Sequence, residues 1–164
     1  MLTDLSGCIS VHSSYDGEYL ILGNETNTVL IYRLDNQYTV FQTITDSSTK
    51  VEGMPMTSDK NTIVMGGNDQ HIRVYKMASG SFTLSQTFHV GVDMYQVYFD
   101  GENLILTGIS PSIKFYKYDG TDLQFDFSIN TGQYNISVLS LSQNLSTFSY
   151  GSDNTTFHIY AKVN

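Results

Sequence analysis

Few side chains in this sequence have the chemistry of a metal site, and their spacing gives them no partners. The four histidines are His12, His71, His89 and His158. No His-x-x-x-His or carboxylate–histidine spacing of a metal site is present. The pattern predicts structural or solvent-exposed histidines.

Three aspartates, Asp16, Asp59 and Asp100, recur at spacings of 43 and 41 residues and could form an acidic ring. Glycine follows two of them, at Gly17 and Gly101. Aspartate in a tight turn accepts backbone N–H hydrogen bonds, which gives the three residues a local structural role. We therefore expect turn chemistry here, with an acidic ring as the alternative.

Covalent and phosphate chemistry have no recognisable motif either. The sequence lacks the Ser/His/Asp order of a hydrolase triad and a Gly-x-Ser-x-Gly elbow. Gly66-Gly67 and Asn130-Thr131-Gly132 are turn-like, and no helical pattern follows to make either one a phosphate loop. Cys8 is the only cysteine, so an internal disulfide and a cysteine-based zinc site are ruled out. The sequence predicts a non-enzyme with no catalytic residue, cofactor or metal.

The charge balance limits the classes of partner. Eight basic and sixteen acidic residues give a net charge of −8, and no Lys/Arg cluster is present. Binding to nucleic acid or to an anionic membrane surface requires such a cluster, so we expect neither partner. No apolar run approaches the ~18 residues of a membrane span, and no signal-peptide pattern opens the sequence. We expect an intracellular, cytoplasmic protein.

The elements that position these side chains are expected to be β-strands. Aromatic residues make up 13% of the chain and charged residues only 15%, a composition that suits half-buried strands. The segment 65–76 shows the pattern clearly, since a Gly/Asn/Asp turn joins two alternating runs. Gly and Asn tolerate the positive φ that such a hairpin turn needs. No segment has helical periodicity, so the sequence predicts one all-β domain over residues 1–164.

The hairpin belongs to a fourfold repeat. Its marker is a tyrosine preceded by an apolar residue, spaced by 43, 41 and 44 residues, at Tyr32, Tyr75, Tyr116 and Tyr160. Around these markers we predict four units at about 9–44, 51–88, 94–129 and 136–162. The first three units contain four short strands, including an inner strand at Glu52–Met56, and the fourth contains three. Four-stranded units with a period of 40 to 45 residues are typical of propeller blades.

Two segments of the repeat, Gly66–Tyr75 and Gly151–Tyr160, resemble the small-Gly-Ser-x-Asp-x-Thr-Ile-Arg-Leu-Trp motif of the WD-repeat family. Tyr15–Leu20 resembles that family's Ser-Pro-Asp-Gly-x-x-Leu turn. The sequence departs from the family in having tyrosine where the motif has tryptophan. Asp69 matches the turn aspartate, but its unit lacks the family's Gly-His before the inner strand, so we expect blade geometry to depend on packing and turns. The resemblance implies a non-enzymatic scaffold that mediates protein–protein interaction in a multiprotein assembly.

Four blades raise the question of closure, because an open row leaves apolar faces and strand edges exposed at both ends. Three arrangements follow. The chain could be half of a larger propeller, two copies could close an eight-bladed ring, or four blades could close alone. Met1–Leu5 is a very short candidate for a strand that completes the last blade. We expect one of the first two, so the partner is a second copy or another chain that completes the propeller.

Three loops connect the outer strand of one unit with the inner strand of the next: Thr45–Lys50, His89–Asp93 and Asn130–Asn135. They are expected to gather on one face, the face on which WD-repeat proteins commonly bind partners. Their anchors would be Lys50, His89, Tyr95 and Tyr134, since aromatic residues are frequent interface anchors. Ordinary connecting loops are the alternative interpretation.

A second class of function is a propeller enzyme or a carbohydrate-binding module with a site at the blade tops. Carboxylates that converge at the propeller axis with perturbed pKa values would favour this class. An axis lined by apolar, Ser and Thr side chains would count against it.

Overall fold

The computed structural model describes residues 7–35, 37–46, 50–132, 135–142, 145–153 and 157–161. In these ranges the chain forms fifteen strands in four antiparallel sheets and contains no helix. No helix of the described residues is therefore long and apolar enough to cross a membrane.

Each sheet is one blade, with its strands hydrogen-bonded in chain order. Blade 1 contains β1 (Cys8–Ser13), β2 (Tyr19–Asn24), β3 (Val29–Asp35) and β4 (Gln37–Ile44). Blade 2 contains β5 (Val51–Gly53), β6 (Thr62–Gly67), β7 (His71–Ala78) and β8 (Ser81–His89). Blade 3 contains β9 (Met94–Phe99), β10 (Asn103–Gly108), β11 (Ser112–Tyr118) and β12 (Leu123–Asn130). Blade 4 contains β13 (Ile136–Leu141), β14 (Thr147–Ser152) and β15 (Phe157–Ala161).

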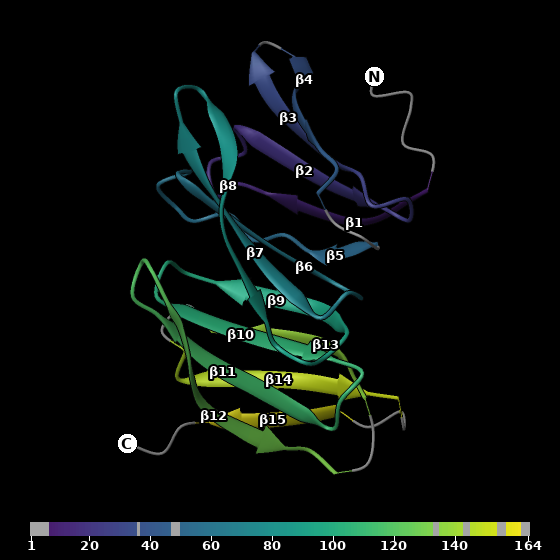
Figure 1. The fold of residues 1–164 in the computed structure, drawn as a ribbon. Coiled ribbons are helices and arrows are strands. Elements are labelled where there is room, and N and C mark those ends of the chain that lie inside the picture. The colour runs from purple at the N-terminus through teal and green to yellow at the C-terminus, as the bar shows by residue number, and fades with distance from the viewer. Residues whose placement is uncertain are drawn as a thin grey trace.

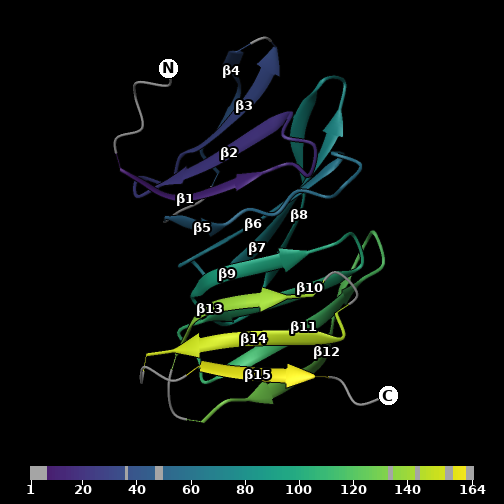
Figure 2. The same ribbon diagram turned by 180° about the vertical axis from the view of Figure 1, so that it is seen from behind.

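The predicted fold class is confirmed: the protein is an all-β propeller segment of four blades, and the described part of the last blade has three strands. Figures 1 and 2 show the blades in chain order, with blade 1 at the top and blade 4 at the bottom. The inner strands β1, β5, β9 and β13 pack against one another in that order. The assignment of the whole of residues 1–164 to a single domain stays a prediction.

The blades are held together by side chains that alternate between the two faces of each sheet. We call the face turned toward the next blade in the chain the forward face, and the other the backward face. The forward face of blade 1, with Ile21, Val29 and Ile31, packs on the backward face of blade 2, with Ile63 and Tyr75. Two further clusters join blades 2 and 3 and blades 3 and 4 in the same manner. Each blade therefore buries the face that it turns toward a neighbouring blade.

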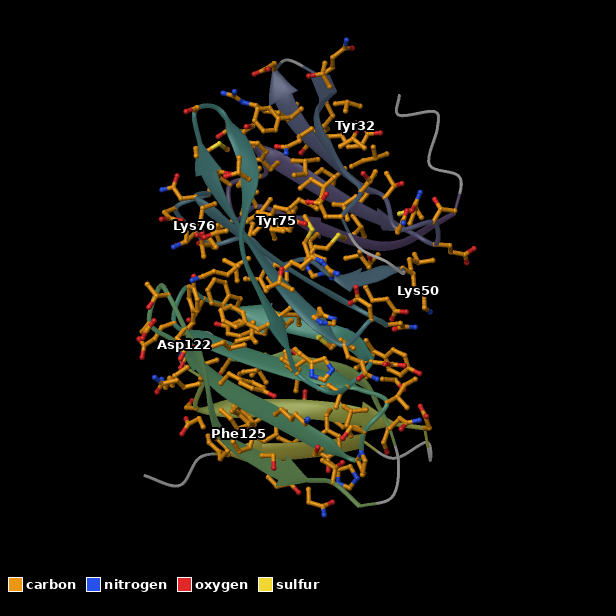
Figure 3. The ribbon with its side chains drawn as sticks, in the orientation of Figure 1. Tyr32, Lys50, Tyr75, Lys76, Asp122 and Phe125 are labelled. Carbon is orange, nitrogen blue, oxygen red and sulfur yellow. The ribbon has the colours of Figure 1, made fainter. Side chains whose placement is uncertain are left out.

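The motif tyrosines follow this rule. Tyr75 and Tyr116 lie on the backward faces of blades 2 and 3 and are buried in the clusters between blades. Figure 3 shows Tyr75 near the middle of the structure and Tyr32 within blade 1. Burial raises the pKa of the Tyr116 hydroxyl, as expected for a phenol placed among apolar side chains. These residues are packing residues of the blades.

Two local expectations differ from the structure. The residue with positive φ in the turn between β6 and β7 is Gln70, at 61°, and the glycines before it lie in β6. A Cβ at Gly67 would collide with the carbonyl oxygen of Lys50, so glycine is required there by the close approach of β5. The inner strand β5 is also shorter than the predicted Glu52–Met56, because Pro55 has no N–H for the ladder.

Candidate protein-interaction surfaces

The recurring aspartates are turn residues. Asp16 Oδ1 accepts the N–H of Glu18 at 3.1 Å and the hydroxyl of Ser14 at 2.8 Å. Asp59 and Asp100 make the corresponding backbone hydrogen bonds in their own turns. The hydrogen bond from Thr57 and those from Asn61 lower the pKa of Asp59. The interpretation as turn chemistry is confirmed.

The first two of these turns are also joined across blades 1 and 2. Lys60 Nζ donates to Asp16 Oδ2 at 2.8 Å and to Glu18 Oε2 at 2.5 Å. The hydrogen bond from Lys60 lowers the pKa of Asp16 well below its usual range, and the same contact raises the pKa of Lys60. These carboxylates are therefore satisfied within the chain rather than presented to a ligand.

Of the predicted loop anchors, Lys50 and Tyr95 lie near each other at the propeller axis. Lys50 Nζ is 2.5 Å from Glu52 Oε1, and this hydrogen bond raises the pKa of Lys50, with a smaller contribution from Tyr95. Figure 3 shows Lys50 beside the start of β5. The two residues thus share one end of the inner strands with the carboxylate of Glu52.

The other two predicted anchors do not join this pair in the described structure. The His89 ring lies against the ring of His71 across β7 and β8, with centroids 5.1 Å apart. His71 Nδ1 is in turn 2.6 Å from the carbonyl oxygen of Asp69. Tyr134 lies outside the described residues. His89 is therefore part of a local histidine pair at the edge of blade 2.

A cavity of about 470 Å³ lies on the axis, between the four inner strands. Its lining is mainly apolar, Ser and neutral polar: Ile9, Ser10, Val11, His12, Glu52, Tyr95, Gln96, Val97, Tyr98, Leu139, Ser140 and Leu141. Glu52 is the single carboxylate among these described residues, and burial lowers the pKa of His12. No group of three or more His, Cys, Asp or Glu suited to a metal ion occurs among the described residues. The converging carboxylates that would favour an enzyme are not found in this lining.

The forward face of blade 4 is the most exposed apolar surface of the repeat. Phe157 is 66% exposed and Ile159 is 69% exposed. In blades 1 to 3 the position of Phe157 is occupied by Val29, Ile72 and Ile113, which are 0–1% exposed. In blades 1 and 2 the position of Ile159 is occupied by Ile31 and Val74, which are at most 2% exposed. Val138 lies on the same side, opposite Gly151, which in turn pairs with Phe157. The face has the side chains of a blade interface but nothing in the described structure covers it.

The backward face of blade 1 is the second end face. Cross-strand pairing places Val11 beside Leu22, and Val40 beside Tyr32. Val11 and Val40 are exposed, whereas Leu22 and Tyr32 are already buried within the blade. This face is apolar as well, and less open than the forward face of blade 4.

Sequence reasoning predicted exposed apolar faces at both ends of the row of blades but did not name the residues that form them. The signal was available in the repeat, because Phe157 and Ile159 occupy the positions that pack forward in every other blade. To assign these residues to one surface, it is necessary to know which positions of a strand point to the forward face. The register of the strands supplies this information, and the sequence alone does not.

Comparison with known proteins identifies the architecture. No protein-family model and no curated protein matches the chain. Among solved structures 1244 chains match, so the fold is shared too widely to indicate one function. One of them, a chain in a crystal structure of a mitotic checkpoint complex, is 15% identical and superposes with a TM-score of 0.82. The match covers 96% of this chain and 51% of that chain, so this chain spans about half the other's length. The protein has a WD-repeat-like propeller fold.

Proposed function

We propose that the protein is a non-enzymatic, WD-repeat-like scaffold that mediates protein–protein interaction within a multiprotein assembly. The observation that carries the proposal is the open forward face of blade 4. Phe157 and Ile159 are about two-thirds exposed at positions that are buried where a following blade is present. Exposed apolar patches of this kind mark interaction sites on soluble proteins. The chemistry of the patch fits a protein surface shaped like the backward face of a blade.

The partner proposed for this face is a second copy of the chain, which completes the propeller. Every blade contact within the chain joins a forward face to a backward face. Two copies related by a twofold axis would join blade 4 of each to blade 1 of the other, so both end faces would be covered. The solved chain of the checkpoint complex contains about as much chain again beyond the shared part, and a second copy supplies that amount.

The loop face is proposed to contribute further protein contacts through Lys50, His89, Tyr95 and Tyr134. Support comes from Tyr95, a half-buried aromatic residue at the axis, and from the cation of Lys50 beside it. The intracellular, cytoplasmic location expected from the sequence stays a prediction.

The test is the mass of the protein in solution, measured by light scattering on a size-exclusion column. We expect a species of twice 18.4 kDa at micromolar concentration. Replacing Phe157 and Ile159 by Asp should convert it to the monomer. The same double change at Leu84 and Ile109, which are also exposed apolar residues but lie away from the end faces, should leave the dimer intact.

Each copy carries a net charge of −8, so added salt should strengthen the association by screening the repulsion between copies. A wild-type protein that remains monomeric up to high micromolar concentration would refute the second copy as the partner. Loss of the dimer in both double variants would show that the forward face of blade 4 is not the contact.

A further inference from the structure

Blade 4 presents a free strand edge in the described structure. In the other blades the third strand pairs with a fourth: β3 with β4, β7 with β8 and β11 with β12. Among the described residues β15 pairs with β14 alone. The outer edge of such a strand offers unpaired N–H and C=O groups to any chain that can lie beside it.

A cavity of about 500 Å³ lies beside this edge, between blades 3 and 4. Figures 1 and 2 show β12 and β15 near each other at the bottom of the molecule. The walls of the cavity include two stacked aromatic pairs. Phe115 and Phe127 have ring centroids 4.3 Å apart, and Phe148 and Tyr160 have centroids 5.1 Å apart. The walls are thus aromatic and preformed, and Phe127 is 46% exposed.

The equivalent space between blades 1 and 2 is filled. Phe82 of β8 is buried there, with its ring edge-on to Tyr19 at 6.2 Å and to Phe41 at 6.3 Å. By the register of the repeat, Asn103 and Asp126 occupy in blade 3 the positions that Tyr19 and Phe41 occupy in blade 1, and both line the cavity. The cavity is therefore the site of an outer-strand side chain that the described part of blade 4 does not supply.

A second correspondence indicates where a fourth strand of blade 4 would run. Phe127 is opposite Phe115 in blade 3, as Gln42 is opposite Ile31 in blade 1. The Gln42 side chain donates to the carbonyl of Phe82 at 2.7 Å and accepts its N–H at 2.8 Å, so it contacts the backbone of the next outer strand. Gln86 in blade 2 donates to the carbonyl of Thr121, at the start of the next outer strand. Phe127 thus faces the place of a following outer strand.

We propose that this cavity and the free edge of β15, together called the groove, bind an extended segment of a partner protein. The segment pairs with β15 as the fourth strand of blade 4. The inference deepens the proposed scaffold function and rests on it. Addition of a strand to an open sheet edge is a common mode of peptide recognition, in which backbone hydrogen bonds give affinity and alternate side chains give specificity. The segment should carry an aromatic or large aliphatic side chain for the space between blades 3 and 4. Because the chain has a net charge of −8, the segment should be neutral or basic.

The groove and the dimer face are on opposite sides of β15. Tyr160 lines the groove, whereas Phe157 and Ile159 belong to the forward face. A strand in the groove and a second copy on the forward face can therefore be tested separately.

The probe is a fluorescein-labelled peptide with the sequence of Ser81–His89, the outer strand of blade 2. This strand pairs with β7 so that Leu84 lies opposite Tyr75, and Tyr75 is the equivalent of Tyr160 in β15. Its binding to the full chain is followed by fluorescence anisotropy. We expect saturable binding that weakens at least tenfold in Phe127→Asp. The matched control is Phe125→Asp on the same strand, which should bind within twofold of the wild type. Phe125 is 57% exposed and is not part of the groove lining; Figure 3 shows it on the outer strand of blade 3.

Two further arms complete the test. A peptide with Asp in place of Phe82 should bind at least tenfold more weakly than the parent peptide. The Phe157→Asp/Ile159→Asp protein should still bind the parent peptide, whatever its effect on the dimer, so failure of the second-copy proposal leaves this result interpretable. Hydrogen exchange should show new protection at β15 on binding.

Absence of saturable binding to the wild type, or equal binding by Phe127→Asp and Phe125→Asp, would overturn the proposal. So would protection changes at β7 in place of β15, which would indicate that the peptide exchanges with the chain's own β8. Circular dichroism of each variant confirms that the fold is retained.

Discussion

Two isoleucines at the same position of the repeat offer a direct test of the open end. Ile31 and Ile159 each precede the motif tyrosine and each point to the forward face, but Ile31 is 0% exposed and Ile159 is 69% exposed. Replacing either by Ala makes the same chemical change in the third strand of a blade. The difference between the two costs therefore isolates the burial of the forward face.

The magnitudes follow from burial. Ile→Ala removes three carbon atoms, worth about 2.4 kcal/mol when fully buried, and the residual cavity brings the cost at Ile31 to about 3 kcal/mol. Ile159 has lost only about a third of its exposure, so the same change should cost about 0.7 kcal/mol, with no cavity. For a chain of this length these costs correspond to shifts in Tm of roughly 6–12 °C and roughly 1–3 °C.

The assay is thermal and urea unfolding of both variants, followed by circular dichroism and by tyrosine fluorescence to check that the two probes coincide. At submicromolar concentration, where a dimer of moderate affinity dissociates, the difference in free energy of unfolding should be about 2 kcal/mol. At concentrations that populate the dimer, Ile159→Ala should become more costly, because association stabilises the folded state by mass action.

The dilute measurement decides the reasoning. Equal costs at Ile31 and Ile159 would mean that the forward face of blade 4 is covered in the isolated chain. A cost below about 1 kcal/mol at Ile31 would mean that burial between blades 1 and 2 contributes little to stability.

Three further predictions test the interior of the structure. Asp69→Ala should destabilise the protein by about 3 kcal/mol, because it removes the partner of the largely buried Arg73 guanidinium, 2.6 Å away; Arg73→Met with Asp69→Ala should recover part of this loss in urea unfolding. Gly67→Ala should lower Tm, because a Cβ at this position would collide with the backbone next to β5. Gly80→Ala should reduce the free energy of unfolding by about 1 kcal/mol, because the site has open space but a positive φ of 85°. Asp59 has a lowered pKa, so its contribution to stability is present above the ordinary pKa of about 4 and is lost as the pH falls below it. Thr57→Val should raise that pKa toward the ordinary value, measured by NMR titration of Asp59, and an unchanged pKa would show that the Thr57 hydroxyl is not its main cause.

The fold could be predicted from the sequence because the pattern of one blade recurs four times in it. The spacing of the motif tyrosines defines the unit, and alternation within each unit defines the strands. The structure differs from these expectations where a local signal had a non-local cause. Gly67 is required by the approach of the Lys50 carbonyl, which lies just before β5 on the neighbouring strand. This cause is not visible in a single hairpin.

The candidate surfaces were harder to predict, for a physical reason. A loop is recognised from its own residues, so the anchors Lys50 and Tyr95 could be named from the sequence. An end face is recognised by apolar side chains that no neighbouring blade covers. Their exposure depends on which blade follows in space. Asp69 shows a similar limit within a blade: its carboxylate lies 2.6 Å from the Arg73 guanidinium of the same unit, a pairing that we did not predict from the sequence.

The contacts between blades show which interactions maintain the geometry of the repeat. The lysine contacts between blades differ from one junction to the next: Lys60 joins the turns of blades 1 and 2, and Lys76 donates to the carbonyl of Gly120 in blade 3. The glutamine contacts of Gln42 and Gln86 use one equivalent position at these two junctions. The apolar faces, by contrast, use equivalent positions at every junction. The apolar faces are thus the contacts common to all three junctions, whereas the polar contacts are conserved only in part.

That division has a consequence at blade 4. The forward face retains the apolar residues that set blade geometry, so it can accept another blade without new chemistry. In the described structure no outer-strand side chain fills the groove beside β15, and Phe127 lines it at the position where blades 1 and 2 have glutamine. A glutamine side chain contacts a backbone that is already in place, whereas an aromatic wall gains most from a side chain that arrives with a partner. The forward face therefore suits a structural contact between copies, and the groove suits the exchangeable contact of a scaffold.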